Sequence, residues 1–152
     1  MPLPFFVVFE GGEAAGKSTQ TRLTSAYLVR QGYKVTRVTE PGSTSLGLRI
    51  RRLVKYGPMA ITPLAETMLF LAARTQLVRE IISPALARGE AIVSDRFADS
   101  TLAYQGYGRG LDVADLRRLN AIATSGIVPD LTVLLDIPVE ASINRRSPRV
   151  TD

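Results

Sequence analysis

Short apolar runs alternate along the chain with longer segments in which apolar residues recur every three or four positions. Four of the runs are rich in Val, Ile, Leu or Phe, as expected of buried parallel strands. They cover Phe5–Glu10, Lys34–Thr39, Ala91–Asp95 and Leu131–Ile137. Because strands and helices alternate, the pattern predicts a mostly parallel sheet with helices on both faces, a three-layer α/β/α arrangement.

Helical spacing predicts four helices between these strands. The first covers Gly16–Gln31 and ends at Gly32. The third is expected to start with Thr62 as its cap and Pro63 at its first position, and Pro84 should kink or interrupt it. The apolar positions of the later three helices are Leu46, Ile50, Leu53 and Val54; Leu64, Met68, Leu71, Leu77 and Ile81; and, after a start marked by Asp112 and Asp115, Leu116, Leu119 and Ile122. No repeat or linker interrupts the pattern, so residues 1–152 are expected to form one domain.

The run GGEAAGKS from Gly11 to Ser18 fits the phosphate-binding pattern G-x-x-x-x-G-K-[ST], directly after the first strand and before the first helix. Glycines let backbone N–H groups curl around a triphosphate, while Lys17 reaches its outer phosphates and Ser18 offers a hydroxyl to Mg²⁺. A plain glycine-rich turn is the alternative, but the order of strand, loop and helix favours the nucleotide site. The expected fold is therefore that of a P-loop NTPase.

Asp95-Arg96-Phe97 follows the third predicted strand, at the carboxyl end where open α/β sheets bind their ligands. Asp95 could hold Mg²⁺ or its water there, and Arg96 could neutralise phosphate charge. An Asp-Arg pair at a strand end is often a structural ion pair, but the P-loop upstream favours the functional interpretation.

Phe70 and Arg74 are four residues apart on the third predicted helix, so they share a face. A ring that stacks on a base, beside a guanidinium that donates to a carbonyl at the base edge, describes a pyrimidine pocket. The alternative is a core phenylalanine beside a surface arginine.

Composition narrows the chemistry further. The 152 residues include no Cys and no His, which excludes disulfides, thiolate zinc sites and a Ser-His-Asp hydrolase. Proton transfer and metal binding must then rest on carboxylates, hydroxyls, lysine or backbone groups, which suits a Mg²⁺-phosphate enzyme. The amino-terminal apolar stretch is too short for a signal or membrane helix, so a cytoplasmic location is expected.

The formal net charge of +5 would also fit nucleic-acid binding, with a local basic cluster formed by Arg49, Arg51, Arg52 and Lys55. That cluster lacks interleaved aromatic residues and any recognisable nucleic-acid module. We therefore favour a small nucleotide as the ligand, and expect neither a nucleic-acid nor a membrane partner.

Taken in order, these segments resemble the thymidylate kinases, P-loop enzymes that phosphorylate dTMP to dTDP with ATP and Mg²⁺. The family's R-E-P-G-G-T stretch is matched by TEPGST at 39–44, its nucleobase helix by MLFLAAR at 68–74 and its helix-two arginine by Arg51. Its D-R-[YHF] element is matched by Asp95-Arg96-Phe97, and its S-S-x-A-Y-Q-G run by STLAYQG at 100–106. The resemblance spans nearly the whole chain, and it implies a role in dTTP biosynthesis and a homodimer formed through helices.

The resemblance also implies a role for each matched residue. Phe70 would stack on thymine, with Arg74 at the base edge and Tyr104 where a 2′-hydroxyl would project. The ATP-binding residues would be Gly11, Gly12, Glu13, Ala14, Ala15, Gly16, Lys17, Ser18 and Thr19; the substrate-binding residues Glu40, Pro41, Arg51, Phe70, Arg74, Arg96, Ser100, Tyr104 and Gln105; the catalytic residues Glu13, Lys17, Asp95 and Arg96; and the Mg²⁺ ligands Ser18 and Asp95.

Two departures from the family pattern concern phosphate-binding loops. Thr39 stands where the family has an arginine, and Ser43 stands where it has a second glycine. Ala14 and Ala15 place the P-loop with the subgroup whose catalytic arginine comes from a flexible lid.

A third departure is that the chain ends where the family lid begins, so the lid remainder, the next strand and the terminal helices are expected to be missing. The basic residues available there are Arg145, Arg146 and Arg149. Two alternatives to a working thymidylate kinase follow. One is a kinase for another nucleoside monophosphate, and the other is a catalytically impaired nucleotide-binding remnant.

Overall fold

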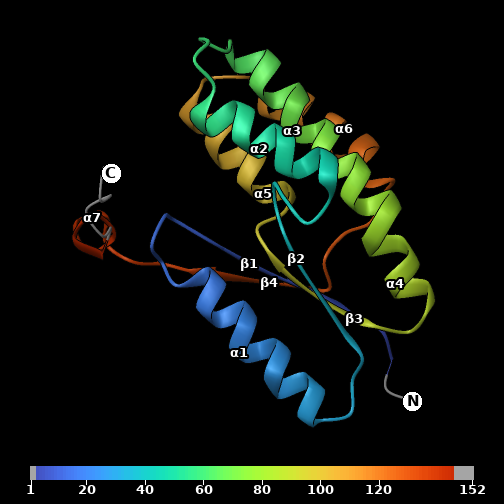
Figure 1. The fold of residues 1–152 in the computed structure, drawn as a ribbon. Coiled ribbons are helices and arrows are strands. Elements are labelled where there is room, and N and C mark those ends of the chain that lie inside the picture. The colour runs from blue at the N-terminus through green and yellow to red at the C-terminus, as the bar shows by residue number, and fades with distance from the viewer. Residues whose placement is uncertain (1–2, 146–152) are drawn as a thin grey trace.

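The computed structural model describes residues 3–145, which form a four-stranded sheet between helices (Figure 1). The strands β1 (Phe6–Gly11), β2 (Val35–Thr39), β3 (Ala91–Asp95) and β4 (Leu131–Leu135) are ordered β2-β3-β1-β4, and each pairing is parallel. The predicted α/β fold and its four strands are confirmed, with strand ends that differ by no more than one or two residues from the sequence prediction.

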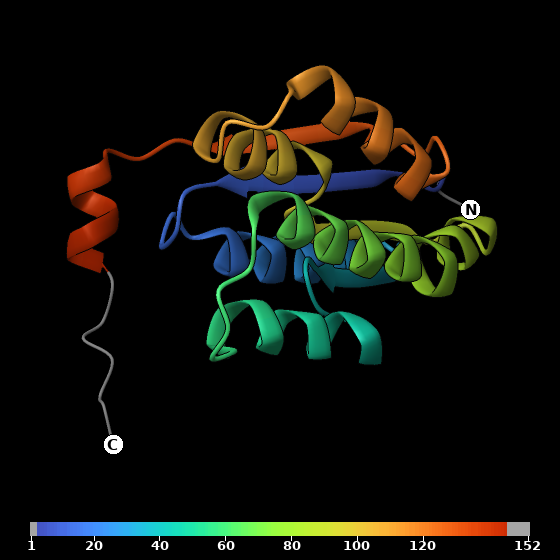
Figure 2. The same ribbon diagram turned by 90° about the horizontal axis from the view of Figure 1, so that it is seen from above.

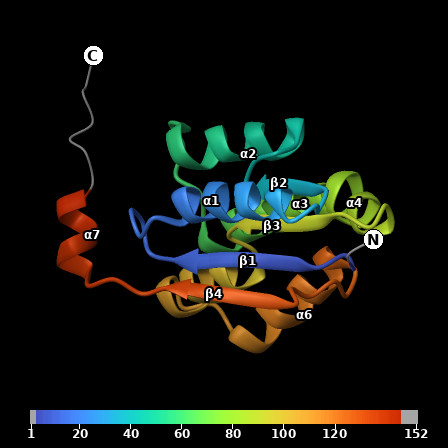
Figure 3. The same ribbon diagram turned by 90° about the horizontal axis from the view of Figure 1, so that it is seen from below.

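Helices lie on both faces of the sheet, as predicted. Helix α1 (Lys17–Arg30) covers one face, and α3 (Pro63–Leu77), α4 (Ser83–Ala87) and α6 (Val113–Thr124) lie on the other (Figure 1). Helix α2 (Ser45–Tyr56) runs alongside α3 and packs against it (Figure 2). Helix α7 (Val139–Arg145) lies beyond the carboxyl end of β4, away from the other helices (Figure 3).

Alternating side chains of β1 supply both layers of the core, because successive residues of a strand point to opposite faces. Phe6 and Val8 pack with Leu77, Ile82 and Ile92 on the α3–α4 side. Val7 and Phe9 pack with Val93 on the α1 side, where Leu28 joins them. The sheet is therefore a rigid platform whose strand ends can position a site.

The third predicted helix is interrupted ahead of Pro84, as expected. Helix α3 ends at Leu77, a π-helical segment η1 covers Val78–Ile82, and α4 begins at Ser83. Thr62 occupies the N-cap position and Pro63 the first position of α3, as predicted, although the Thr62 side chain makes no cap hydrogen bond. Thr67 makes the side-chain bond in the first turns instead, donating to the Pro63 carbonyl oxygen at 2.8 Å.

Helix α6 starts as predicted, since the Asp112 carboxylate accepts a hydrogen bond from the Asp115 N–H at 2.9 Å. Its buried face differs from the predicted one. Leu116 is buried, but Ile122 is 75% exposed, and the other buried residues of α6 are Asn120, Ala123 and Thr124. Positions that are each three residues apart shift progressively around a helix with 3.6 residues per turn. Positions separated alternately by four and three residues stay on one face.

The expectation that all four strands are buried fails for β4, where Leu131 and Leu134 are 57% and 68% exposed. Within residues 3–145, β4 pairs only with β1 and forms an edge of the sheet. Three helical segments were not predicted: α5 (Ala98–Thr101), the π-helical η2 (Leu102–Gly108) and α7. They are short, and they carry no apolar periodicity. No helix of the described part is long and apolar enough to cross a membrane.

Candidate active site

The P-loop has a glycine at each end, where the backbone adopts a conformation that other residues rarely adopt. Gly11 has φ +143°, and a Cβ atom there would lie 2.5 Å from the Leu135 carbonyl oxygen. Gly16 has φ +97° and is the N-cap of α1, where no side chain occupies the first N–H groups. These N–H groups and the positive end of the helix dipole therefore remain available to an anion.

Lys17 is buried beneath this loop, and its ammonium donates to the Gly12 carbonyl oxygen. Burial lowers the pKa of Lys17, and the nearby Arg96 guanidinium lowers it further, while Asp95 is the strongest of the acids that oppose this. An anionic phosphate would relieve both unfavourable effects, because it supplies the opposite charge. Ala15 is buried in the same loop, and Thr19 is exposed on the first turn of α1.

Ser18 and Asp95 meet although 77 residues separate them, because β1 and β3 are neighbours in the sheet. The Ser18 hydroxyl donates to Asp95 Oδ2 at 2.6 Å. Both groups offer the hard oxygen ligands that Mg²⁺ prefers. No cluster of three or more acidic side chains suited to a metal occurs among residues 3–145. A Mg²⁺ ion held here would take its remaining ligands from phosphates and water, as is usual for this ion.

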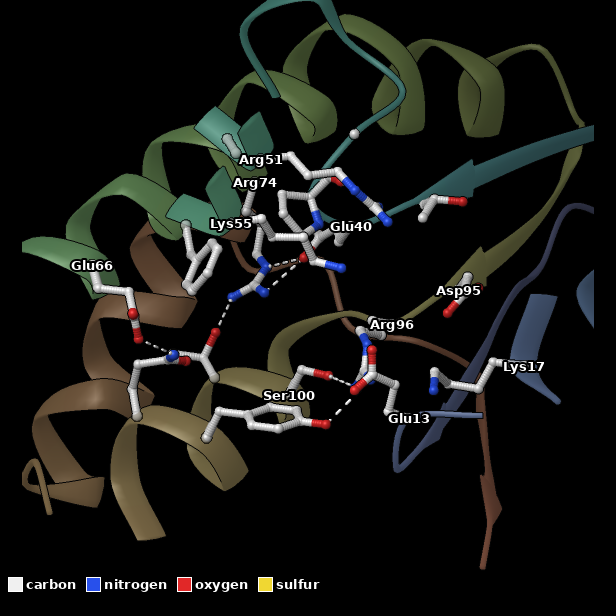
Figure 4. A pocket seen from close by; sticks show the side chains of 18 of the residues that line it. Glu13, Lys17, Glu40, Arg51, Lys55, Glu66, Arg74, Asp95, Arg96 and Ser100 are labelled. Carbon is white, nitrogen blue, oxygen red and sulfur yellow. Dashed lines mark hydrogen bonds and ion pairs between the residues drawn. The ribbon is translucent and has the colours of Figure 1, made fainter. Parts of the chain in front are cut away.

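A cavity of about 630 Å³ extends from the P-loop to α3 and η2. Figure 4 shows Lys17 and Asp95 at one end, Glu66 at the other, and Arg74 and Arg96 between them. All nine residues predicted to bind the substrate line it: Glu40, Pro41, Arg51, Phe70, Arg74, Arg96, Ser100, Tyr104 and Gln105. Its volume is in the range typical of small-molecule sites. The predicted catalytic residues Glu13, Lys17 and Asp95 line the same cavity.

A smaller cavity of about 300 Å³ also lies at the P-loop, lined by Ala14, Gly16, Lys17, Ser18, Thr19 and Arg145. Ala14, Lys17 and Ser18 line both cavities. Of the three basic residues expected near the end of the chain, Arg145 therefore reaches the P-loop, whereas Arg146 and Arg149 lie outside the described residues.

Arg96 occupies a strained position at the end of β3, with φ +73°. Its guanidinium donates to Ser100 Oγ at 3.1 Å and to the Tyr104 hydroxyl at 3.2 Å, and it lies over the Tyr104 ring. Ser100 in turn donates to Glu10 Oε2 at 2.7 Å, and that oxygen is 4.0 Å from Arg96. A non-glycine residue at positive φ costs energy, and such strain is often found at functional sites. Arg96 is thus held by contacts on three side chains.

Phe70 and Arg74 share the cavity face of α3, as their spacing predicts. The alternative of a core phenylalanine beside a surface arginine is wrong, because Phe70 is half-buried and Arg74 is only 3% exposed. The Arg74 donors are all engaged within the protein. The guanidinium donates to Glu40 Oε2, Thr101 Oγ1, Asn120 Oδ1 and the Phe97 carbonyl oxygen, at 2.5 to 3.0 Å.

Glu40 lies directly behind Arg74 and is buried. Both Arg74 contacts go to Oε2, at 2.7 and 2.6 Å, and within the described part Oε1 is buried with no hydrogen-bond partner. Burial raises the pKa of Glu40, and the Arg74 guanidinium opposes that rise. Burying the Glu40 carboxylate therefore lowers the stability of the protein, and its ion pair with Arg74 explains why it lies there.

The basic cluster on α2 divides between two environments. Arg51 and Lys55 line the cavity (Figure 4), and Arg51 donates to the Pro41 carbonyl oxygen at 3.1 Å. Arg49 and Arg52 are exposed. Near Arg51, the Ser43 hydroxyl accepts a hydrogen bond from the Thr39 N–H at 2.9 Å, although Ser43 itself has φ +60°. The two substituted positions of the family stretch are thus joined to each other.

Sequence reasoning did not single out Glu10, Lys55 or Glu66 as part of the site. The sequence pattern predicts Glu10 only as the end of a strand, yet its carboxylate accepts hydrogen bonds from the Phe97 N–H and the Ser100 hydroxyl. Glu66 lies four residues before Phe70 and Lys55 four after Arg51, so helical spacing could have placed both on the cavity side. Glu13 lines the cavity, and its carbonyl oxygen accepts from Ser142 of α7 at 2.6 Å.

The arrangement combines phosphate-binding groups at one end of a cavity with an aromatic ring and polar side chains at the other. It can bind a ligand with an anionic and a flat polar part, and a second cavity shares the P-loop residues Ala14, Lys17 and Ser18. The fold and the site thus define a P-loop nucleotide-binding protein of the α/β class.

Comparison with known proteins makes the assignment specific. The family model for thymidylate kinase matches residues 9–151. The chain is 50% identical over 147 residues to a thymidylate kinase from Geobacter sp. (strain M21), and 52% identical over 147 residues to one from Desulfovibrio desulfuricans. A crystal structure of thymidylate kinase from Ehrlichia chaffeensis superimposes with a TM-score of 0.85 at 35% identity, covering 95% of this chain and 82% of that one. The chain belongs to the thymidylate kinase family.

These alignments cover 96% and 95% of this chain, but 65% of the Geobacter relative and 67% of the Desulfovibrio relative. The chain thus spans about two thirds of the length of the curated relatives that it matches.

Proposed function

We propose that this protein transfers the γ-phosphoryl group of ATP to dTMP, giving dTDP and ADP. The observation that carries this proposal is the pair of cavities that share Ala14, Lys17 and Ser18. Two sites that meet at one phosphate-binding loop suit a donor and an acceptor whose phosphates must approach each other. Family membership supports dTMP as the acceptor.

In this proposal, an oxygen of the dTMP phosphate attacks the γ-phosphorus of ATP, and the bond from that phosphorus to the β–γ bridging oxygen breaks. No strong general base is needed, because the acceptor phosphate is already an anion. Lys17 and the first N–H groups of α1 would stabilise charge on the transferred group, and Arg51 and Arg96 would hold the acceptor phosphate. Positioning and charge neutralisation therefore account for most of the catalysis.

Ser18 and Asp95 would hold Mg²⁺, directly or through water. When bound, the ion would neutralise charge that develops on the phosphate oxygens. The hydrogen bond between Ser18 and Asp95 supports this assignment, because it keeps one hydroxyl and one carboxylate oxygen together beside Lys17.

The base end of the cavity supports a pyrimidine. Phe70 presents a half-buried ring, and the polar groups of Ser100 and Gln105 line the same cavity. Tyr104 would exclude a 2′-hydroxyl and so favour the deoxyribose form. Because the Arg74 donors are engaged within the protein, the proposed bond from Arg74 to the base edge would be shared with, or replace, one of these contacts.

The test is a coupled assay of ADP release with dTMP, dCMP, dGMP and UMP, paired with calorimetric titration of each monophosphate. We expect dTMP to bind most tightly and to support transfer. Equal affinity for all four would refute the selective pocket, and selective binding of another monophosphate would assign the protein to that substrate.

A homodimer is part of the proposal. Leu46 and Leu48 of α2 and Met68 of α3 are 42%, 47% and 46% exposed, so these helices leave apolar surface uncovered within the described residues. Ile50, in contrast, is buried by the packing of α2 on α3. Sedimentation at tens of micromolar should show a dimer, and a monomer throughout would refute it. The cytoplasmic location likewise stays a prediction.

A further inference from the structure

Glu66 lies at the base end of the cavity, at the end opposite Lys17 (Figure 4). It projects from α3, four residues before Phe70, and is only 8% exposed. The burial of this carboxylate must be compensated, because burying an ionised group is unfavourable unless it is paired and hydrogen-bonded. Two hydrogen-bond partners provide this compensation.

Each Glu66 oxygen accepts one hydrogen bond from the segment that follows β3. Gln105 Nε2 donates to Oε1 at 3.0 Å, and the Arg109 guanidinium donates to Oε2 at 3.0 Å. Gln105 is buried, whereas the Arg109 side chain is 52% exposed. The inner contact, between Glu66 and Gln105, is therefore the one shielded from water.

This contact determines how the Gln105 amide is turned. An ionised carboxylate only accepts hydrogen bonds, so the amide must present its nitrogen to Glu66 and not its oxygen. Gln105 lines the cavity. Within residues 3–145 its amide oxygen accepts no hydrogen bond, and it is not buried without a partner. The amide oxygen is thus the atom left to meet a ligand.

A fixed acceptor distinguishes between pyrimidines. Thymine carries an N–H at ring position 3, which can donate to an amide oxygen. Cytosine carries a lone pair at the same position, so the two acceptors would repel each other. An amide that could turn over would accept either base, since it would offer nitrogen to one and oxygen to the other.

We propose that Glu66 is a specificity-determining positioning residue, which selects thymine over cytosine by holding the Gln105 amide nitrogen and so turning the amide oxygen toward the base. This inference rests on the proposed dTMP site. Arg109 partners Glu66 from the solvent side, but it does not itself set the direction of the amide, because the carboxylate remains an acceptor without it.

The test compares Glu66→Gln with Arg109→Gln, using calorimetric titration of dTMP and dCMP. Glutamine has the shape of glutamate but can both donate and accept, so in Glu66→Gln the Gln105 amide is free to turn. We expect the ratio of dCMP to dTMP dissociation constants to fall by about tenfold, which corresponds to the loss of one typical hydrogen-bond preference. Arg109→Gln removes the same ion pair but keeps the carboxylate, so its ratio should match the wild-type protein. A purely structural role for Glu66 would change both affinities in parallel and leave the ratio intact, and that result would overturn the inference.

If Glu66→Gln does not fold, as judged by circular dichroism, the same titrations on a double variant with Glu66→Gln and Gln105→Glu test the inference. In that double variant the amide at position 66 can donate to the carboxylate at position 105, whose other oxygen can face the base. The preference for dTMP should therefore remain. A lost preference would overturn the inference. A wild-type protein that binds dTMP and dCMP equally would also overturn it, since Glu66 would have no selectivity to set. Turnover with dTMP would then show separately whether the proposed function survives.

Discussion

Replacing Arg74 by Met should destabilise the protein strongly, because the change leaves an acid buried without its cation. Arg74 and Glu40 are 3% and 6% exposed, and their closest atoms are 2.6 Å apart. Methionine keeps much of the side-chain length but has no N–H group. Among residues 3–145, Glu40 would then lose its only charged hydrogen-bond partner, and its Oε1 already lacks a partner there.

The magnitude follows from the burial. Removing one partner of a buried ion pair typically costs about 3–5 kcal/mol, because the remaining charge stays in a poorly solvating environment. Thr101, Asn120 and the Phe97 carbonyl also lose a donor, but costs within one network are not additive. We therefore expect a loss of about 3–5 kcal/mol, or about 6–20 °C in Tm for a chain of this size.

The loss should depend on pH. Burial raises the pKa of Glu40 above its ordinary value of 4.5, and the Arg74 guanidinium opposes this rise, so the pKa is raised further in Arg74→Met. An acid whose pKa is raised by folding holds its proton more tightly in the folded state. The free energy of unfolding then falls as the pH rises from about 4.5 toward the raised pKa. The deficit of the variant relative to the wild-type protein should be larger at pH about 8 than at pH about 5.

Urea unfolding of the wild-type protein, Arg74→Met, Glu40→Gln and the double variant measures the coupling between the two residues. The double variant should be more stable than Arg74→Met, because glutamine removes the unpaired charge and keeps the shape. A loss below about 1 kcal/mol in Arg74→Met, the range of exposed ion pairs, would refute the reasoning. So would a double variant no more stable than Arg74→Met.

Three further substitutions test the other end of the cavity. Lys17→Ala should lower phosphoryl transfer by about 10²–10³-fold without unfolding the chain; unchanged ADP release would remove Lys17 from its proposed role. Asp95→Asn should raise the Mg²⁺ concentration needed for half-maximal transfer by about 10–100-fold, and a Mg²⁺ titration that matches wild type would argue against Asp95 as part of the metal site. Arg145→Ala should weaken ATP binding but not dTMP binding, because Arg145 lines the smaller cavity and not the larger one; calorimetry showing the opposite pattern would place the donor elsewhere.

Apolar patterning could predict the sheet because its central strands are buried on both faces. Strand β3 is buried at every position, and its predicted bounds are confirmed without change. The pattern was less informative where burial is partial. The edge strand β4 is as apolar as a buried strand but largely exposed, and α6 buries the polar Asn120 instead of Ile122. In both cases the tertiary arrangement, rather than composition, decides which side chains are covered.

The site residues that could be predicted are those with an unusual local pattern. The P-loop is visible because its glycines and lysine have fixed spacing, and Arg74 because it follows Phe70 at helical distance. Glu10 carries no such pattern. Glu66 lies at helical distance from Phe70, but that spacing does not predict its burial, since an acid on a helix or at a strand end is normally solvated. Only the fold shows that these acids are buried and face the segment after β3.

Three buried acids in or next to the cavity have one feature in common: each accepts a hydrogen bond from a side chain that lines the cavity and that the proposed function assigns to ligand binding. Glu40 holds Arg74, Glu66 holds Gln105, and Glu10 holds Ser100, which in turn contacts Arg96. A side chain fixed in this way loses little further conformational freedom when a ligand arrives, so more of its interaction energy contributes to binding and transfer. The arrangement has a cost in stability, because isolated buried acids are unfavourable and Glu40 Oε1 has no hydrogen-bond partner in the described part. Well-packed apolar residues would stabilise the same positions better, but they could not fix the direction of a guanidinium or an amide. The acids are therefore best explained as the groups that orient the ligand-binding side chains.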